Sequence, residues 1–261
     1  MMKEKYWVPA IERADMVLKE ISKYPHQLRL IDLSKRLNIN KSSLFSLLKT
    51  LEYLGWIVKD GGDVYSLGPS IGAFSSSYLS QFNLLQSFYK EAALSVSKVN
   101  EHIQLGVLQK TNVVYLGKVE GDSGVRLITD PGMQFPAYAS SIGKIQLIQY
   151  TKQELRDIFS EGDWERKTPY TTSNIDELYE KVQTAKQSGY AIENQEAALG
   201  FHCVAAPVYN FEYKVIAGVS FSMTTSSWEF KKEAARDEII KLADRLSQLA
   251  GFTGELKQNM E

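Results

Sequence analysis

Cysteine and histidine are scarce in this sequence, which has one Cys and three His among 261 residues. The single cysteine, Cys203, excludes a disulfide within the chain and fits a protein of the reducing cytoplasm. Short metal-ligand spacings such as CxxC or HxxxH do not occur in the sequence. We therefore predict neither a bound metal nor another cofactor.

Long apolar runs are also missing, and no stretch reaches the ~18 residues of a membrane-spanning helix. The N-terminal MMKEKYWVPAIERAD carries charges throughout and lacks the apolar core of a signal peptide. The formal net charge is −1, so the whole-chain charge points neither to nucleic acid nor to an anionic membrane. We expect a cytoplasmic protein without membrane contact.

The charges are nevertheless unevenly distributed along the chain. Residues 1–68 contain 11 Lys and Arg against 8 Asp and Glu, whereas the remaining residues contain 19 against 23. Four cations and no acidic residue lie between Asp32 and Glu52, namely Lys35, Arg36, Lys41 and Lys49. The basic excess therefore falls in the N-terminal quarter, where small polar residues accompany it.

Three helices and two short strands are predicted for this quarter. Apolar residues recur at helical spacing in residues 8–25, in 29–39 and in 41–55, and Asn40 can cap the third helix. The segments WIVKD and VYSLG then form two predicted strands around the turn GGD. This order of elements predicts a winged helix-turn-helix over residues 1–68.

The sequence after residue 68 predicts a linker helix and a second domain. Residues 69–82 are Ser-rich, with apolar residues spaced for a helix. Between 83 and 253, helical segments alternate with short apolar or alternating runs: HIQLGVLQ, NVVYLGKVE, GVRLITD, GYAIEN, FHCVAAPVYN and KVIAGVSFSM. We predict an α/β fold of the α+β type, with helices flanking one mostly antiparallel sheet, and a tail at 254–261.

The polar start of the third helix is the candidate DNA-reading surface, because this part of a helix-turn-helix meets base edges in the major groove. The residues assigned to this face are Lys41, Ser42, Ser43, Phe45 and Ser46. The residues assigned to phosphates, which supply affinity and register, are Lys35, Arg36, Lys49 and the wing residue Lys59. An ordinary solvated helix face is the alternative, and the helix–turn–helix–wing pattern favours DNA.

Several motifs give the chain a resemblance to a known family. They are IERADMVLKEI and KSSLFSLLKTLEYLGWIVKD in the N-terminal part, and PAYASSIGKIQL, GYAIENQEAALGFHCVAAPVYN and VIAGVSFS in the C-terminal part. Along nearly its whole length the sequence resembles the IclR family of bacterial transcription regulators. The resemblance implies a winged helix-turn-helix joined to a GAF-like effector-binding domain, double-stranded operator DNA as a partner, and assembly into homodimers or homotetramers.

The sequence departs from the family pattern at four positions. Ser46 stands where Arg is usual, which removes a strong contact to phosphate or guanine. Tyr138 replaces a His, Glu193 an Asp, and Gln195 the first of two acidic residues. These differences bear on operator preference and ligand class rather than on the fold.

The resemblance also implies a small-molecule site on the sheet of the C-terminal domain. The ligand-binding groups of the family map to the backbone amides of Ser141 and Ile142 and to the side chains of Glu193, Cys203, Ser220 and Ser222. The two serines are two residues apart, so on a strand they face the same side. Amides at the start of a helix suit an anion, and we expect a small hydroxy- or keto-carboxylate as effector. Each of these side chains could instead be structural, Cys203 for example as a buried apolar filler.

Cys203 leaves two other functions to consider. His202 and Cys203 are adjacent in a predicted strand, so their side chains point to opposite faces and cannot pair as nucleophile and base. We therefore predict that the chain is not an enzyme. A metal- or redox-responsive regulator that uses Cys203 is the alternative reading, although no short ligand spacing joins this residue to the histidines.

Overall fold

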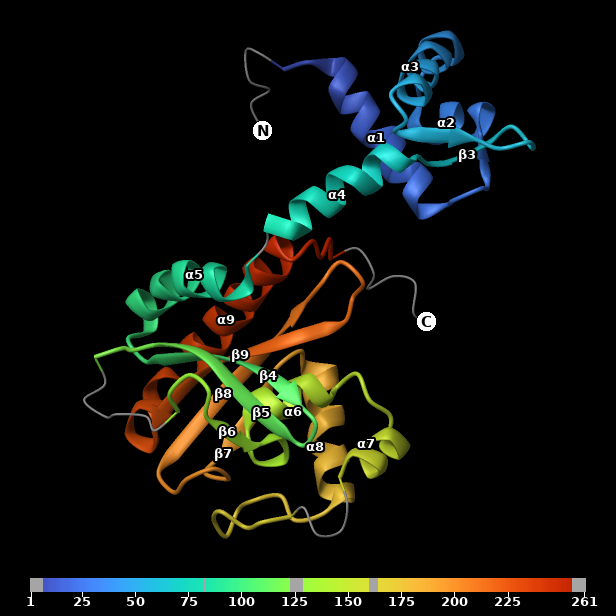
Figure 1. Ribbon diagram of the computed structural model, residues 1–261. Coiled ribbons are helices and arrows are strands. Elements are labelled where there is room, and N and C mark those ends of the chain that lie inside the picture. Colours follow the sequence, from blue (N-terminus) through green and yellow to red (C-terminus); the bar gives the residue numbers. More distant parts are fainter. Residues whose placement is uncertain (1–6, 82, 123–128, 160–163, 255–261) are drawn as a thin grey trace. The chain divides into compact units, whose positions relative to one another are not determined.

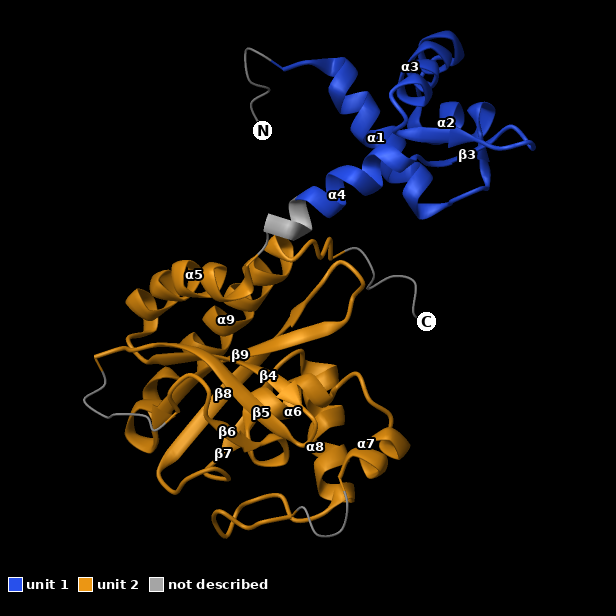
Figure 2. Ribbon diagram, viewed as in Figure 1, with its two compact units in different colours: residues 1–81 blue, residues 82–261 orange. Residues whose placement is uncertain are grey.

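Two compact units make up the chain in the computed structural model, residues 1–81 and residues 82–261 (Figure 2). The structure describes residues 7–81, 83–122, 129–159 and 164–254. The strand predicted at 124–130 lies almost entirely outside the described residues. Each unit has a hydrophobic core of its own.

The first unit is a small winged helical fold (Figure 1). Its elements are α1 (Pro9–Lys23), β1 (Leu28–Arg29), α2 (Leu30–Leu37), α3 (Lys41–Tyr53), β2 (Ile57–Lys59), β3 (Val64–Leu67) and α4 (Pro69–Gln81). Strand β3 lies between β1 and β2 in an antiparallel sheet, and β2 and β3 form the predicted wing. The helix expected as a linker, α4, belongs to this unit.

The apolar stripe of α3 explains how this helix sits in the first unit. Leu44, Leu48 and Leu51 are spaced three and four residues apart, so they share one helix face, and all three are buried in the same core as Leu33. The predicted cap is confirmed, because Asn40 Oδ1 accepts a hydrogen bond from the amide that follows it by two residues, at 2.9 Å. The polar face of α3 therefore remains at the surface.

The second unit is built on a six-stranded antiparallel sheet in the order β6-β5-β4-β9-β8-β7. Its elements are α5 (Leu84–Val99), β4 (His102–Gln109), β5 (Asn112–Val119), β6 (Gln134–Pro136), the short 3-10 helix η1 (Ala137–Ala139), α6 (Ser141–Leu147), α7 (Lys152–Ile158), α8 (Ile175–Ser188), β7 (Ala191–Asn194), β8 (Phe201–Tyr209), β9 (Val215–Thr224) and α9 (Thr225–Leu249). The predicted α+β class is confirmed by this arrangement.

The two faces of the sheet carry separate cores. Helices α5 and α9 cover one face, where Phe88 and Leu242 pack with Phe221 of β9. Helices α6 and α8 lie on the other face, where Ile145 packs with Ala205 of β8. Successive strand residues alternate between these two cores, as a sheet covered on both sides requires.

Helix α6 approaches the sheet and η1 very closely. A Cβ atom at Gly143 would lie 2.1 Å from the carbonyl oxygen of Ala137, and one at Gly218 would lie 3.1 Å from the Ile142 side chain. Because glycine has no Cβ atom at these positions, α6 can pack directly against η1 and β9. Gly143, in the stretch PAYASSIGKIQL, therefore has a packing role that is independent of any ligand.

Some local expectations differ from the structure. The short strands β1 and β6 were not predicted, because two or three residues carry no periodicity and their pairing is set by tertiary contacts. Leu249 has the helical spacing of the buried residues of α9, but it is the last residue of that helix and is 37 % exposed. The other apolar residues at this spacing, Ile239, Leu242 and Leu246, are buried.

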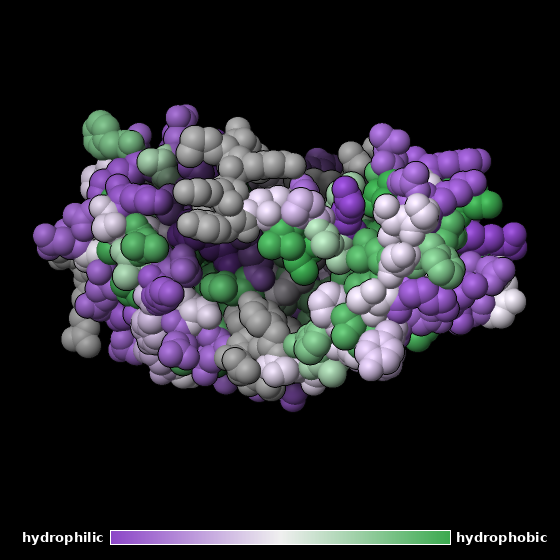
Figure 3. Space-filling model, turned by 90° about the horizontal axis from the view of Figure 1, so that it is seen from above, coloured by the Kyte–Doolittle hydropathy of each residue, from purple (hydrophilic) through white to green (hydrophobic). Residues whose placement is uncertain are grey.

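The surface mixes polar and apolar side chains. Figure 3 shows hydrophilic residues over much of the visible face, with small hydrophobic patches between them. None of the described helices combines the length and the apolar character that crossing a bilayer requires.

Candidate functional site

The outer face of α3 presents the residues that the sequence assigned to base edges. Lys41, Ser42, Ser43, Phe45 and Ser46 are all exposed, whereas Leu44, Leu48 and Leu51 of the same helix are buried. Phe45 is 52 % exposed, which is unusual for an aromatic ring that has a core available. The helix therefore offers a polar surface with one aromatic ring, at the end where a recognition helix enters the major groove.

Three of the cations assigned to phosphates pair with carboxylates of their own unit. The pairs are Arg36–Glu20 at 2.8 Å, Lys49–Glu52 at 2.9 Å and Lys59–Asp63 at 2.6 Å. Such exposed pairs are weak, so a phosphate can replace the carboxylate. Lys35 and Lys41 are exposed and form no ion pair with a residue that the structure describes.

The serine hydroxyls of α3 are not equivalent. The Ser42 hydroxyl donates to Asn40 Oδ1 at 2.7 Å, and the Ser46 hydroxyl donates to the Ser42 carbonyl at 3.3 Å. The Ser43 hydroxyl has no hydrogen bond to any residue within the described ranges. Ser43 is therefore the serine whose hydroxyl is available to a base without first giving up a contact.

A cavity of about 260 Å³ opens on the sheet of the second unit, on the face that also carries α6. Its lining residues within the described ranges are Gln104, Tyr115, Thr129, Phe135, Glu193, Ala197, Ala198, Phe201, Cys203 and Ser222. Three of the six residues predicted for the effector site are among them, namely Glu193, Cys203 and Ser222. The cavity thus combines aromatic rings with a few polar groups, as small-molecule sites do.

A chain of hydrogen bonds crosses the floor of this cavity. Ser222 Oγ donates to Gln104 Oε1 at 2.9 Å, so the Cys203 thiol, 3.2 Å from Ser222 Oγ, is placed to donate to that hydroxyl. The Gln104 amide in turn donates to the hydroxyl of Thr129. The polar side chains of β4, β8 and β9 are therefore ordered before any ligand enters.

Glu193 is the most unusual group of the cavity. Its side chain is fully buried, and its Oε1 accepts hydrogen bonds from the amides of Glu196 and Ala197, the latter at 2.9 Å. Its Oε2 has no hydrogen-bond partner among the described residues. Burial raises the pKa of the Glu193 carboxyl, because the charged form loses its hydration. One carboxylate oxygen is thus without a hydrogen bond to a described residue, although the neighbouring Cys203 thiol acts to lower the pKa of this carboxyl.

The other three predicted effector residues occupy different places. Ser141 and Ile142 begin α6, where the Ser140 hydroxyl accepts from the Gly143 amide at 2.9 Å. Both are buried, as is Ser220, but none of the three is among the described lining residues.

Sequence reasoning missed Gln104, Tyr115, Thr129, Phe135 and Phe201, which complete the lining. Gln104 gave one usable signal, because a glutamine interrupts the apolar positions of HIQLGVLQ. Burial raises the pKa of the Tyr115 hydroxyl well above its usual range, so it is a neutral donor in the cavity. The pairing of β4 with β9 that brings Gln104 beside the serines could not be read from either strand alone.

Two family models match the chain. "Bacterial transcriptional regulator IclR C-terminal" matches residues 76–248, and "IclR helix-turn-helix domain" matches residues 10–61. The chain belongs to the IclR family. It is a transcriptional regulator with a helix-turn-helix DNA-binding domain and a C-terminal effector domain.

Other members of the IclR family are similar over most of the chain. KdgR of Dickeya chrysanthemi is 28% identical over 200 residues, which are 76% of this chain and 66% of that protein. XynR of Escherichia coli is 27% identical over 247 residues, covering 94% of this chain and 98% of XynR. The crystal structure of the Agobacterium tumefaciens repressor BlcR has the same fold, with a TM-score of 0.79, 24% identity, and coverage of 94% of this chain and 98% of BlcR.

The departures from the IclR pattern have structural consequences. Tyr138 is buried beside Phe159 and Trp164, and its hydroxyl donates to the Glu165 carbonyl at 2.9 Å, so it is not among the described lining residues. Gln195 has φ 55° and accepts the Gly200 amide at 2.9 Å, which shapes the turn after β7.

The alternative roles of Cys203 gain little from the geometry. His202 lies on the opposite face of β8, stacked on Trp228 at 5.4 Å, as the strand alternation predicted. Across the described ranges, no cluster of three His, Cys, Asp or Glu side chains is arranged to hold a metal ion. Burial raises the pKa of the Cys203 thiol, and the nearby Glu193 carboxylate raises it further, which is the opposite of an activated nucleophile. The curated relatives are transcriptional regulators.

Proposed function

We propose that the chain binds operator DNA as a homodimer through α3 and the wing, and that it does so in the cytoplasm. The exposed polar face of α3 supports this proposal most directly. It presents Lys41, which forms no ion pair with a described residue, and Ser43, whose hydroxyl bonds to none, while the leucines on the opposite face are buried. Two copies would place two recognition helices on two half-sites. A homotetramer of two such dimers is compatible with the same contacts.

An electrophoretic mobility shift with the DNA upstream of its own gene tests this proposal. Binding should weaken steeply as salt is raised, because each neutralised phosphate releases counterions. Absence of any shift at low salt would reject the DNA-binding role, and a shift of constant strength between low and high salt would reject the phosphate contacts.

We further propose that the cavity of the second unit binds a small hydroxy- or keto-carboxylate. The free oxygen of Glu193 is an acceptor for a ligand hydroxyl, and the hydroxyls of Tyr115 and Thr129 are donors for carbonyl or carboxylate oxygens. The amides of Ser141 and Ile142, the original candidates for the carboxylate, lie outside the described lining. The ligand therefore has its hydroxyl end at Glu193 and its acceptor end at the β5 side.

Pairs of acids that differ in one hydroxyl test the ligand class. Lactate and propionate are such a pair, and a ligand that binds the folded state raises its melting temperature. We expect lactate-type hydroxy acids to raise the melting temperature more than the matched unsubstituted acids, and Glu193→Gln to remove the difference. Equal shifts for both members of every pair would contradict the role of Glu193.

A further inference from the structure

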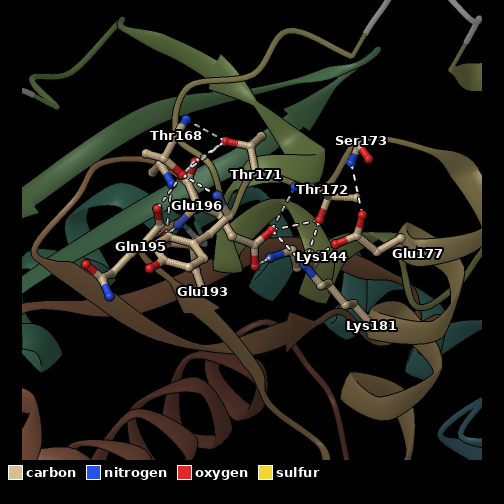
Figure 4. Close-up of polar contacts among 12 residues, drawn as sticks. Lys144, Thr168, Thr171, Thr172, Ser173, Glu177, Lys181, Glu193, Gln195 and Glu196 are labelled. Carbon is tan, nitrogen blue, oxygen red and sulfur yellow. Dashed lines mark hydrogen bonds and ion pairs between the residues drawn. The ribbon is translucent and has the colours of Figure 1, made fainter.

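A buried ion pair lies between α6 and the turn that follows β7 (Figure 4). Lys144 of α6 and Glu196 of the turn are 1 % and 3 % exposed, and their charged groups are in direct contact. The Oε2 atom of Glu196 also accepts a hydrogen bond from the Thr172 hydroxyl at 2.7 Å, and Lys181 Nζ lies 3.1 Å from the same oxygen. Neither member of the pair is among the described residues that line the cavity.

The backbone of the same turn is held by hydroxyls from the segment before α8. Thr171 Oγ1 donates to the Glu196 carbonyl at 2.7 Å, and Thr168 Oγ1 donates to the Gln195 carbonyl at 2.7 Å. Both threonines and Glu196 are buried, so these bonds are shielded from water. The turn at 195–197 is therefore fixed through its side chain and its main chain together.

Two backbone amides of this turn hold the side chain of Glu193 by hydrogen bonds. The amides of Glu196 and Ala197 both donate to Oε1 of Glu193, and Ala197 also lines the cavity. Because both donors hold the same oxygen, the orientation of the turn decides where the second oxygen points. That second oxygen, Oε2, is the buried acceptor without a partner among the described residues.

We propose that Lys144 and Glu196 are positioning residues for effector recognition. They fix the turn at 195–197, and the turn aims Oε2 of Glu193 at a hydroxyl or amine donor of the ligand. Lys144 and Glu196 carry opposite charges in direct contact, so the pair fixes the turn without adding a net charge beside Glu193. This inference rests on the proposed effector site and names the ligand feature, an O–H or N–H donor, that the site reads.

The thiol of Cys203 provides a direct test without any effector. It is the only cysteine, and its backbone pairs with that of Glu193 between β7 and β8, so its alkylation by iodoacetamide reports on that carboxylate. In the parent protein, Glu193→Gln should accelerate alkylation roughly tenfold at neutral pH. The Lys144→Met/Glu196→Gln background removes the ion pair without leaving a lone charge. Because the turn no longer holds Glu193 in place, the acceleration caused by Glu193→Gln should fall below about threefold in this background. The pH–rate profile of that background should also differ from the parent.

Glu177→Gln is the matched control, because Glu177 contacts Lys181 at 2.9 Å but forms no hydrogen bond or ion pair with the turn at 195–197 within the described ranges. In the Glu177→Gln background, Glu193→Gln should still accelerate the alkylation of Cys203 roughly tenfold. A folded Lys144→Met/Glu196→Gln protein that keeps the full factor and the parent pH profile would overturn the proposal. If that protein does not fold, Thr171→Val serves as the background instead, because it removes a main-chain anchor of the turn without changing charge. A reduced acceleration by Glu193→Gln in this background would support the proposal, and an unchanged acceleration would overturn it.

The alkylation test is separate from the proposed DNA-binding and effector functions. It uses neither DNA nor ligand, so the positioning role can fail while a mobility shift with the same variants still shows operator binding. Conversely, a protein without DNA affinity can still show the coupling between the ion pair and Glu193.

Discussion

Replacing Glu193 with Gln is expected to make Cys203 more reactive toward alkylating reagents. The two residues are directly opposed in the antiparallel ladder of β7 and β8. Burial raises the pKa of the Cys203 thiol, and the Glu193 carboxylate raises it further. The thiolate is the reacting species, so removal of the neighbouring negative charge increases the reactive fraction at neutral pH.

The size of the effect follows from the strand geometry. Directly opposed side chains in an antiparallel pair have Cβ atoms about 5 Å apart. Two unit charges at about that distance interact by roughly 3 kcal/mol at an effective dielectric constant of about 20, which is roughly 150-fold in thiolate fraction. A thiolate of lower pKa is also a weaker nucleophile, which cancels about half of the gain on a logarithmic scale. The net acceleration is therefore roughly tenfold.

The assay is the rate of iodoacetamide labelling, followed by mass spectrometry across about pH 6 to 9, where the thiolate fraction of a thiol with a raised pKa is small and grows with pH. Burial raises the pKa of the Glu193 carboxyl, so this group is charged only above that raised pKa. Parent and variant should therefore differ above it and converge below it, where Glu193 is already neutral. Superimposed profiles over the whole range would show that Glu193 does not act on the thiol, and the reasoning would be wrong.

Four further predictions concern single positions. Lys41→Ala should weaken binding to all DNA sequences and flatten the salt dependence, whereas Ser43→Ala should change the preferred sequence, which a selection on random DNA measures. Asn40→Ala should lower the unfolding free energy by about 1 kcal/mol in a urea titration, because α3 loses its cap. Gly143→Ala should lower it by about 3 kcal/mol or more, because the new Cβ would lie 2.1 Å from the Ala137 carbonyl oxygen.

The fold could be predicted from the sequence wherever a long segment carried its own period. The leucine stripe of α3 and its Asn40 cap were readable because both depend on residues only a few positions apart. The end of α8 is local in the same way, because its C-cap Gly189 has φ 80°, a conformation that glycine adopts readily. The short strands β1 and β6 were not readable, because partners far along the chain define them.

The site was predictable only in part, for a related reason. Strand alternation alone placed Cys203 and His202 on opposite faces, and the structure agrees. Motif resemblance pointed to Glu193 and Ser222, which line the cavity with Cys203. The contact between Lys144 and Glu196 joins residues more than fifty positions apart through the packing of α6 behind the turn. No local pattern encodes such a contact.

The two residues of the buried ion pair should differ in how much their single substitutions destabilise the folded protein. Without Lys144, Glu196 still has Lys181 at 3.1 Å and the Thr172 hydroxyl, so Lys144→Met should be tolerated comparatively well. Without Glu196, Lys144 would be a buried cation without its counterion, and Glu196→Gln should cost about 3–5 kcal/mol. The double replacement by neutral side chains should recover most of that loss.

The loss of stability caused by Glu196→Gln should also depend on pH, in a direction that the Lys144 pKa determines. Burial already lowers the pKa of Lys144, and Glu196 is the main group that opposes this. In the variant, the folded state would therefore bind the Lys144 proton less tightly than the unfolded chain does. Stability then rises with pH between the lowered pKa and the ordinary lysine pKa, because the unfolded state binds more protons in that window. Urea titrations at about pH 7 and 9 should show a smaller loss at the higher pH. An equal loss at both would mean that Lys144 stays charged and finds another partner.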